Sequence, residues 1–357
     1  MTKIKMFSLS LVAFAIISCG GDTTETNTKT VGKNSNVAPG LESNTSSESS
    51  SAKDNIFRLN FSDPPTFDPA LVTDTTSASI IVEIFSGLVT LNKELDIIPD
   101  LAESWDISDD GRIYTFNLRD DIKFSNGDKV TASDFKWSIE RAANPDTGSM
   151  NAEVYLGDIV GVTEVIEAGG SLTEVSGLKV IDDKTLEITI DEPKTYFLAK
   201  LTYPTAFVLS EKYVTQQGEN WIDQPVGTGP FVMTEYQIGQ TLKLKPNDNY
   251  WGEKAKVDGI IMNLAGGVSM AMYENDEVDI TGVGLADLER VKDPNDPLNK
   301  DLVNVPPQFS LNYIGFNVNM PPFDDVNFRK ALSHAVDKEI IADKIYSGLT
   351  KPAFSII

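Results

Sequence analysis

The sequence predicts a mixed α/β fold, because short runs of alternating apolar and polar residues are interspersed with longer runs in which apolar residues recur every three or four positions. The alternating runs are typical of half-buried strands, and the longer runs are typical of helices that pack on one side. Turn residues separate several of these runs. With 357 residues, the chain is long enough to form two domains with sizeable cores.

The predicted elements begin at Ile56. Residues 57–61 alternate as a strand, and residues 64–69, which include three prolines, end it. Residues 77–85 have the pattern of a helix, which we expect to end at Gly87.

The stretch from residue 99 to residue 142 carries the clearest local signals. Asp109-Asp110-Gly111 provides a turn residue that can take a positive φ, and residues 113–118 then alternate as a strand. An irregular acidic spacing and an Asn at its twelfth position make a calcium loop here less favoured than a plain hairpin turn. Asn126-Gly127 is a second turn signal. Thr131-Ala132-Ser133-Asp134 resembles a capping box with Asp in place of Glu, so it predicts a helix that carries Phe135, Trp137 and Ile139.

Three shorter elements and one long helix follow. Residues 184–190 and 241–245 alternate as strands, and residues 195–201 are predicted to form a short helix. The long helix begins at a cap provided by Asp324 or Asp325 and ends at Gly348. Its apolar stripe consists of Phe328, Leu332, Ala335, Ile341 and Ile345.

The amino terminus has the pattern of a secretion signal. Lys3 and Lys5 precede an apolar run, residues 6–17, that is too short to span a bilayer comfortably. Ile16-Ile17-Ser18-Cys19 resembles a bacterial lipobox, which predicts that residues 1–19 act as a lipoprotein signal and that Cys19 is lipidated. Residues 20–54 are rich in Ser, Thr and Asn and poor in large apolar side chains, so we expect a disordered tether.

Composition limits the chemistry that this chain can perform. A net charge of −23 disfavours binding to nucleic acid, which depends on Lys and Arg contacts to phosphates, and disfavours broad docking onto anionic lipid. Because the chain has one Cys and one His, it cannot supply a His-rich zinc site or, with Cys19 lipidated, a Cys-His pair. His334 is interpreted as a boundary side chain on the last helix. We therefore expect no catalytic residue, metal or cofactor.

Several spaced motifs resemble those of the family 5 extracellular solute-binding proteins, the oligopeptide- and dipeptide-binding components of ABC importers. The resemblance covers about residues 56–350, with Phe67 where the family usually has Leu. The motifs include Pro64–Pro69, Leu101–Trp105, Tyr114–Phe116, Pro225–Phe231, Asn247 with Asn249–Gly252, Pro322–Val326 and Arg329–Ser333.

The resemblance implies a type II periplasmic-binding-protein-like fold, in which two lobes enclose a cleft and an inserted domain interrupts the first lobe. Lobe I would comprise residues 55–85 and 216–315, and the inserted domain residues 86–215. Lobe II would begin at residue 316 and would be largely missing, so we expect a truncated chain. Gly227-Thr228-Gly229 would form a tight re-entry between domains, since it lacks the spacing of a phosphate-binding loop.

The implied function is that of a substrate-binding component, not an enzyme. It would capture peptides outside the cytoplasmic membrane, at its extracellular or periplasmic face, as a lipid-anchored monomer, and deliver them to ABC permease subunits. Alternatives are another solute, such as a nickel complex, heme or oligosaccharide, or a non-functional fragment. An extracellular hydrolase is disfavoured.

The resemblance also nominates ligand-binding residues. Thr73, Asp74 and Thr75 would contact the peptide backbone, and Tyr155 of the inserted domain would reach the rim. Tyr313 and Phe316 lie on a segment that would cross between the lobes. The competing interpretation is that the threonines cap a loop and that the aromatic residues belong to the core. Trp105, Trp137 and Trp251 are expected to be core residues.

Overall fold

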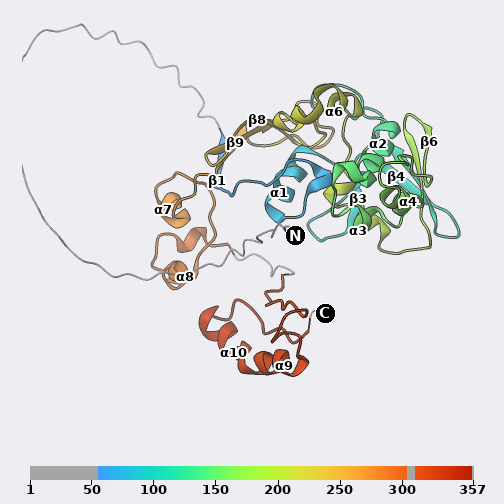
Figure 1. Ribbon diagram of the computed structural model, residues 1–357. Helices are drawn as coiled ribbons and strands as arrows, with labels where there is room; N and C mark the ends of the chain where they lie inside the picture. The colour runs from blue at the N-terminus through green and yellow to red at the C-terminus, as the bar shows by residue number, and fades with distance from the viewer. Residues whose placement is uncertain (1–54, 304–309, 356–357) are drawn as a thin grey trace, which may run out of the picture. The chain divides into compact units, whose positions relative to one another are not determined.

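The computed structural model describes residues 55–303 and 310–355 (Figure 1). The predicted signal, Cys19 and the tether lie outside these residues. Within the described part of the chain, no helix is both long enough and apolar enough to cross a membrane. The mixed α/β fold class is confirmed by the strands and helices that follow.

The first sheet has the order β1-β10-β9-β8. Its strands are β1 (Ile56–Asn60), β10 (Gly259–Asn263), β9 (Thr241–Pro246) and β8 (Phe231–Gln237). Strand β1 pairs in parallel with β10, and the other pairs are antiparallel. This confirms the strands predicted at the start of the chain and at residues 241–245. We call the cluster on this sheet the first core; its fully buried members include Ile80, Ile81, Ile84, Phe85 and Leu242.

Helix α1 (Thr75–Ile84) supplies much of the first core. It begins two residues earlier than predicted, because the carboxylate of Asp74 accepts the Ser77 N–H at 2.8 Å and caps it. The sequence pattern located the helix by its apolar residues, which start only after this cap.

The second sheet is fully antiparallel, in the order β4-β5-β7-β6. Its strands are β4 (Ala102–Ile107), β5 (Ile113–Leu118), β7 (Thr185–Thr189) and β6 (Leu178–Asp182). Gly111 takes a φ of +72° in the β4–β5 hairpin, and every second residue of β5 is buried, as predicted. We call the cluster around this sheet the second core; it includes Phe116, Phe124, Phe135, Leu186 and Ile188.

Helix α2 (Ala132–Ala143) contacts both cores. The Thr131 N–H donates to the Asp134 carboxylate at 2.9 Å, so Asp serves where a capping box usually has Glu. Phe135 and Ile139 lie in the second core, whereas Trp137 packs against the first. Trp105 and Trp251, which the sequence predicts in the core, are partly buried and pack against the second core from its edge. The two cores are thus joined through one helix.

Short elements complete the described chain. The hairpin β2 (Val89–Leu91) and β3 (Ile97–Pro99) lies between the α1 and β4 segments of the chain. The short helix predicted at residues 195–201 is α5 (Phe197–Lys200). The others are α3 (Ala152–Leu156), α4 (Val162–Glu167), α6 (Glu211–Gln217), α7 (Ser269–Glu274), α8 (Leu285–Lys292), η1 (Pro69–Leu71), η2 (Pro145–Thr147), η3 (Pro204–Ala206), η4 (Gly218–Asp223) and η5 (Asn299–Asp301).

The glycines of Gly227-Thr228-Gly229 are required by close backbone approach. A Cβ atom on Gly227 would lie 2.0 Å from the carbonyl oxygen of Ile84, and one on Gly229 would lie 2.6 Å from that of Glu83. The Gly229 N–H donates to the Ile84 carbonyl at 2.8 Å, and the Thr228 hydroxyl accepts from the Ser86 N–H at 3.0 Å. The loop therefore pairs with the carboxyl end of α1. The limits of the inserted domain stay a prediction.

The predicted final helix is wrong in one respect, because it is not continuous. Helix α9 (Val326–Ala335) starts at the Asp325 cap, but Val336 is extended, with φ −94° and ψ 114°. The carboxylate of Asp337 then accepts the Ile340 N–H at 2.9 Å and starts a new turn, α10 (Lys338–Ile340), followed by η6 (Ile341–Ile345). A β-branched residue before a cap residue favours this break. Gly348 ends the segment with φ +74°, as predicted, and His334 on α9 is exposed.

Candidate functional site

The segment of residues 68–75 is held by a buried ion pair. The guanidinium of Arg141, on α2, donates to both carboxylate oxygens of Asp68, at 3.1 and 2.6 Å. Asp68 is 3% exposed, and its carboxylate also accepts the Ala70 N–H at 2.9 Å. A bidentate pair of this kind fixes direction as well as distance. It ties the segment that precedes α1 to the helix that joins the two cores.

A second set of contacts holds the same segment at Val72. The Asn151 amide donates to the Val72 carbonyl at 2.6 Å, and the Tyr203 hydroxyl donates to the same oxygen at 3.2 Å. Tyr155, on α3, stacks on Tyr203 with ring centroids 3.7 Å apart and an interplanar angle of 3°. The structure thus brings a stacked tyrosine pair to the residue directly before Thr73.

Thr73 presents free backbone groups at this place. It is exposed and lies outside helices and strands. Within the described residues, no hydrogen bond takes up its N–H, its carbonyl or its hydroxyl. An extended ligand could pair with such a backbone as an added strand does. Hydrogen bonds fix Val72 and Asp74 on either side, so the free N–H and carbonyl of Thr73 are held in a defined orientation in which a ligand could bond to them.

The electrostatics of the site come from Asp74 and the two phenols. Burial raises the pKa of the Tyr203 phenol, and the neighbouring Tyr155 and the Asp74 carboxylate raise it further. Tyr203 therefore stays neutral at physiological pH and keeps its hydroxyl as a donor to Val72. Asp74 is committed to capping α1, and Thr75 is exposed at the first turn of that helix. Hydrogen-bonding groups and aromatic faces of this kind suit the binding of a ligand.

The other two predicted residues are not joined to this cluster by any described contact. Tyr313 is 79% exposed, and Phe316 stacks on Phe323 with centroids 5.2 Å apart. Sequence reasoning missed Asn151 and Tyr203, which complete the site. Asn151 stands directly before α3, but nothing in the sequence pairs it with a carbonyl 79 residues away.

Comparison with known proteins identifies relatives over most of the chain. The sequence model described as "Bacterial extracellular solute-binding proteins, family 5 Middle" matches residues 96–357. The chain is 31% identical to the dipeptide-binding protein DppE of Bacillus subtilis over 333 residues, covering 92% of the chain and 60% of that protein. It is 32% identical over 314 residues to an Escherichia coli protein named "Probable deoxycholate-binding periplasmic protein YgiS", covering 85% and 57%.

A solved structure agrees with these relatives. It is a periplasmic oligopeptide-binding protein from Borrelia burgdorferi, which superposes with a TM-score of 0.72 and 30% identity and covers 82% of this chain and 59% of that one. The chain therefore spans about 60% of the length of these three proteins. The family model covers more than half of the chain, and it confirms the family that the motifs predicted. The chain belongs to the bacterial extracellular solute-binding proteins of family 5.

Proposed function

We propose that this protein is the substrate-binding component of an ABC importer and captures peptides outside the cytoplasmic membrane. The observation that carries the proposal is the free backbone of Thr73, fixed at Val72 and Asp74 beside the stacked Tyr155–Tyr203 pair. Every peptide offers backbone N–H and carbonyl groups whatever its side chains, so a backbone partner suits a receptor that accepts many sequences.

In this proposal residues 73–75 and Tyr155 form the half of the cleft that belongs to lobe I and the inserted domain. Thr73 pairs with the ligand backbone, and the exposed part of Tyr155 covers one ligand side chain. Tyr313 and Phe316 contribute from the segment that crosses between the lobes. Closure of the lobes around the ligand then excludes water from these hydrogen bonds.

The proposal extends to location and partners. Cys19 carries a lipid anchor, the tether of residues 20–54 lets the folded body reach the permease, and the protein acts as a monomer at the extracellular face of the membrane. Its macromolecular partners are ABC permease subunits, to which it delivers the peptide. The name of DppE as a dipeptide-binding protein supports the ligand class.

A non-peptide solute is the second candidate. The name of YgiS, a probable deoxycholate-binding protein at 32% identity, and the flat surface of the Tyr155–Tyr203 pair favour an apolar ring as the competing ligand. Such a ligand would bind against the tyrosine rings and would not depend on hydrogen bonds to the backbone of Thr73.

A pair of substitutions at Thr73 separates the two candidates. Thr73→Pro removes the backbone N–H, and the extended Val72, with ψ 125°, suits the position before a proline. Thr73→Ala is the matched control, because it keeps the N–H. Loss of one hydrogen bond costs about 0.5–1.5 kcal/mol, which is roughly a two- to twelvefold weaker affinity.

The measurement is calorimetric titration of the full chain with trialanine, a random tripeptide pool and deoxycholate. The proposal expects tripeptide binding that Thr73→Pro weakens and Thr73→Ala preserves. The second candidate would be favoured if deoxycholate binds and the tripeptides do not, and if Tyr155→Ala abolishes deoxycholate binding while Thr73→Pro leaves it unchanged. Tripeptide affinity that is equal in all three variants would remove this site from the proposal.

A further inference from the structure

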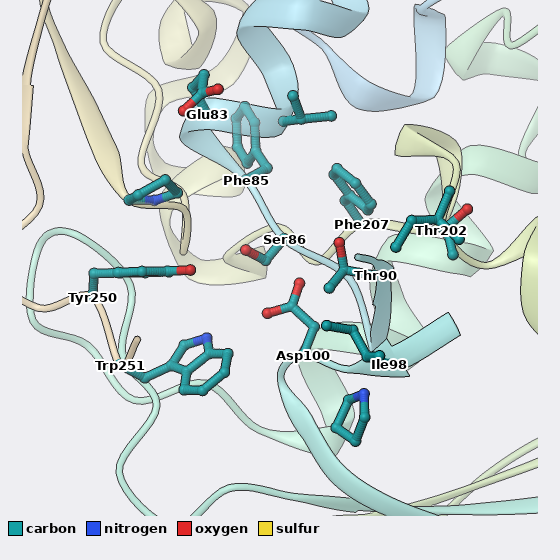
Figure 2. Close-up of a pocket in the computed structure, with 14 residues that line it drawn as sticks. Glu83, Phe85, Ser86, Thr90, Ile98, Asp100, Thr202, Phe207, Tyr250 and Trp251 are labelled. Carbon is teal, nitrogen blue, oxygen red and sulfur yellow. The ribbon is translucent and has the colours of Figure 1, made fainter. Parts of the chain in front are cut away.

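A cavity of about 500 Å³ lies apart from the residues assigned to the peptide (Figure 2). It is bounded by the carboxyl end of α1, the β2–β3 hairpin and the turn that holds Tyr250 and Trp251. None of the residues that line it belongs to the predicted peptide site. Its volume falls within the range of small-molecule sites, which is roughly 300–1,000 Å³. The polar side chains on its wall include Glu83, Ser86, Asp100, Thr202 and Tyr250.

Asp100 is the principal charge in this cavity. It is only 7% exposed, and Figure 2 shows its carboxylate directed toward Ser86 and Tyr250. No lysine or arginine of the described residues forms an ion pair with this carboxylate. The nearest guanidinium, on Arg119, donates from Nε to the backbone carbonyl of Asp100 at 2.6 Å and lies over the Trp251 ring at 3.7 Å. Its charge is therefore directed at the backbone and the indole.

Burial raises the pKa of Asp100 to about 6, although the Trp251 N–H, the Arg119 charge and the Ser86 hydroxyl each lower it from the value that burial alone would give. The carboxylate is consequently ionised at neutral pH in a place that penalises its charge. A buried charge of this kind is stabilised most by a cation that enters the cavity.

Trp251 offers a second unsatisfied group. Its indole N–H is buried and, among the described residues, meets no acceptor in hydrogen-bonding geometry, although it lies near enough to the Asp100 carboxylate to lower the pKa of that group. In Figure 2 the indole nitrogen is turned toward the space that the Asp100 carboxylate faces. A buried donor without a partner is costly, so a ligand atom that accepts a hydrogen bond would be favoured beside it.

The opposite wall carries Glu83, and Tyr250 stands between the two acids. Burial raises the pKa of Glu83. Burial likewise raises the pKa of the Tyr250 phenol, and the charges of Asp100 and Glu83 raise it further. Both titratable carboxylates of the lining are thus close enough to act on one phenol. The cavity combines negative charge with aromatic rings, the combination that binds organic cations.

We propose that this cavity binds a small organic cation: a primary ammonium or guanidinium group rests on Asp100, its body lies against Tyr250 and Trp251, and an acceptor atom of the ligand takes the indole N–H. A bare metal ion fits less well. No cluster of three or more His, Cys, Asp or Glu side chains in the described part of the chain is placed to hold one. The cavity is also far larger than one ion.

The probes are agmatine and benzylamine as amines, glycinamide as a cation that also carries a hydrogen-bond acceptor, and benzyl alcohol, each titrated calorimetrically into the full chain. Benzyl alcohol has the same ring as benzylamine but no charge. We expect agmatine and benzylamine to bind at pH 7.5 and benzyl alcohol not to bind. Affinity at pH 5.0 should be about tenfold weaker, because a carboxyl of pKa about 6 is then only about one-tenth ionised.

Three variants make the assignment specific. Asp100→Asn should weaken the binding of agmatine and benzylamine at least tenfold. Trp251→Phe removes the indole N–H together with part of the ring, so it should weaken the binding of glycinamide, whose carbonyl accepts that N–H, severalfold more than the binding of agmatine, which has no acceptor when protonated. Asp121→Asn, at an exposed acid outside the cavity, is the matched control and should bind as the unmodified chain does. The proposal is overturned if neither amine binds at 10 mM, if benzyl alcohol binds as well as benzylamine, or if Asp100→Asn leaves the affinities unchanged.

Discussion

Removing one partner of the buried ion pair between Asp68 and Arg141 should lower the free energy of unfolding far more than removing one partner of an exposed ion pair. In the Arg141→Met variant the stem of the side chain remains, but the Asp68 carboxylate, 3% exposed, keeps only the Ala70 N–H as a partner. Breaking a buried pair from one side costs about 3–5 kcal/mol, because an uncompensated charge is left inside. For a body of this size, that free-energy loss lowers the melting temperature by roughly 5–8 °C.

The assay is thermal and urea unfolding followed by circular dichroism, with Lys212→Met as the control. Lys212 and Asp128 form a pair of similar length, 3.0 Å, with side chains 62% and 39% exposed. Its loss should cost no more than about 1 kcal/mol. If the orphaned charge is the cause, the double variant Asp68→Asn, Arg141→Met should be more stable than Arg141→Met alone. An Arg141→Met cost no larger than that of Lys212→Met, or a double variant less stable than the single one, would refute the reasoning.

Three further predictions concern single positions. Gly227→Ala places a Cβ atom 2.0 Å from the Ile84 carbonyl oxygen, so it should lower the free energy of unfolding by at least about 3 kcal/mol or prevent folding. The control is Gly282→Ala, whose Cβ atom meets nothing within 4 Å; in the same unfolding assay its stability should be nearly unchanged. Thr131→Ala removes a side-chain contact of the capping box, in which Thr131 Oγ1 donates to the Asp134 carboxylate at 2.7 Å. Urea unfolding should show that the free energy of unfolding falls by about 1 kcal/mol. An unchanged stability would contradict the assigned cap. Asp100 has a folded pKa of about 6, above its unfolded value, so the folded state binds the extra proton and stability falls as pH rises from about 4 to above 6. Over this pH range the free energy of unfolding should fall by about 3 kcal/mol. Urea unfolding at pH 4.5 and 7.5 should therefore show Asp100→Asn more stable, relative to the unmodified chain, at pH 7.5 than at pH 4.5. The same difference in stability at both pH values would argue against a raised pKa.

Signals that lie within a few residues were readable from the sequence. The Gly111 turn, the alternation of β5 and the Thr131–Asp134 cap each depend on side chains at most five positions apart, so local chemistry specifies them. The early start of α1 and the break at Val336 were missed, although both depend on an Asp cap. In each case the predicted limits of the helix followed the apolar stripe, and the Asp that caps the helix was not recognised as its start.

The motifs alone identified the family, because several of them occur in order along the chain, and the match to the family model confirms that identification. They also nominated Thr73, Asp74, Thr75 and Tyr155, which the structure places around one fixed turn. Only the tertiary structure brought Asn151 to Val72 and Arg141 to Asp68, because these partners are more than 70 residues apart and no local pattern encodes their meeting. The tertiary structure likewise shows that Gly227 is needed where its loop approaches α1 closely, and that Asp100 is buried. Distance of approach and burial are properties of packing, whereas turns and caps are properties of neighbouring residues.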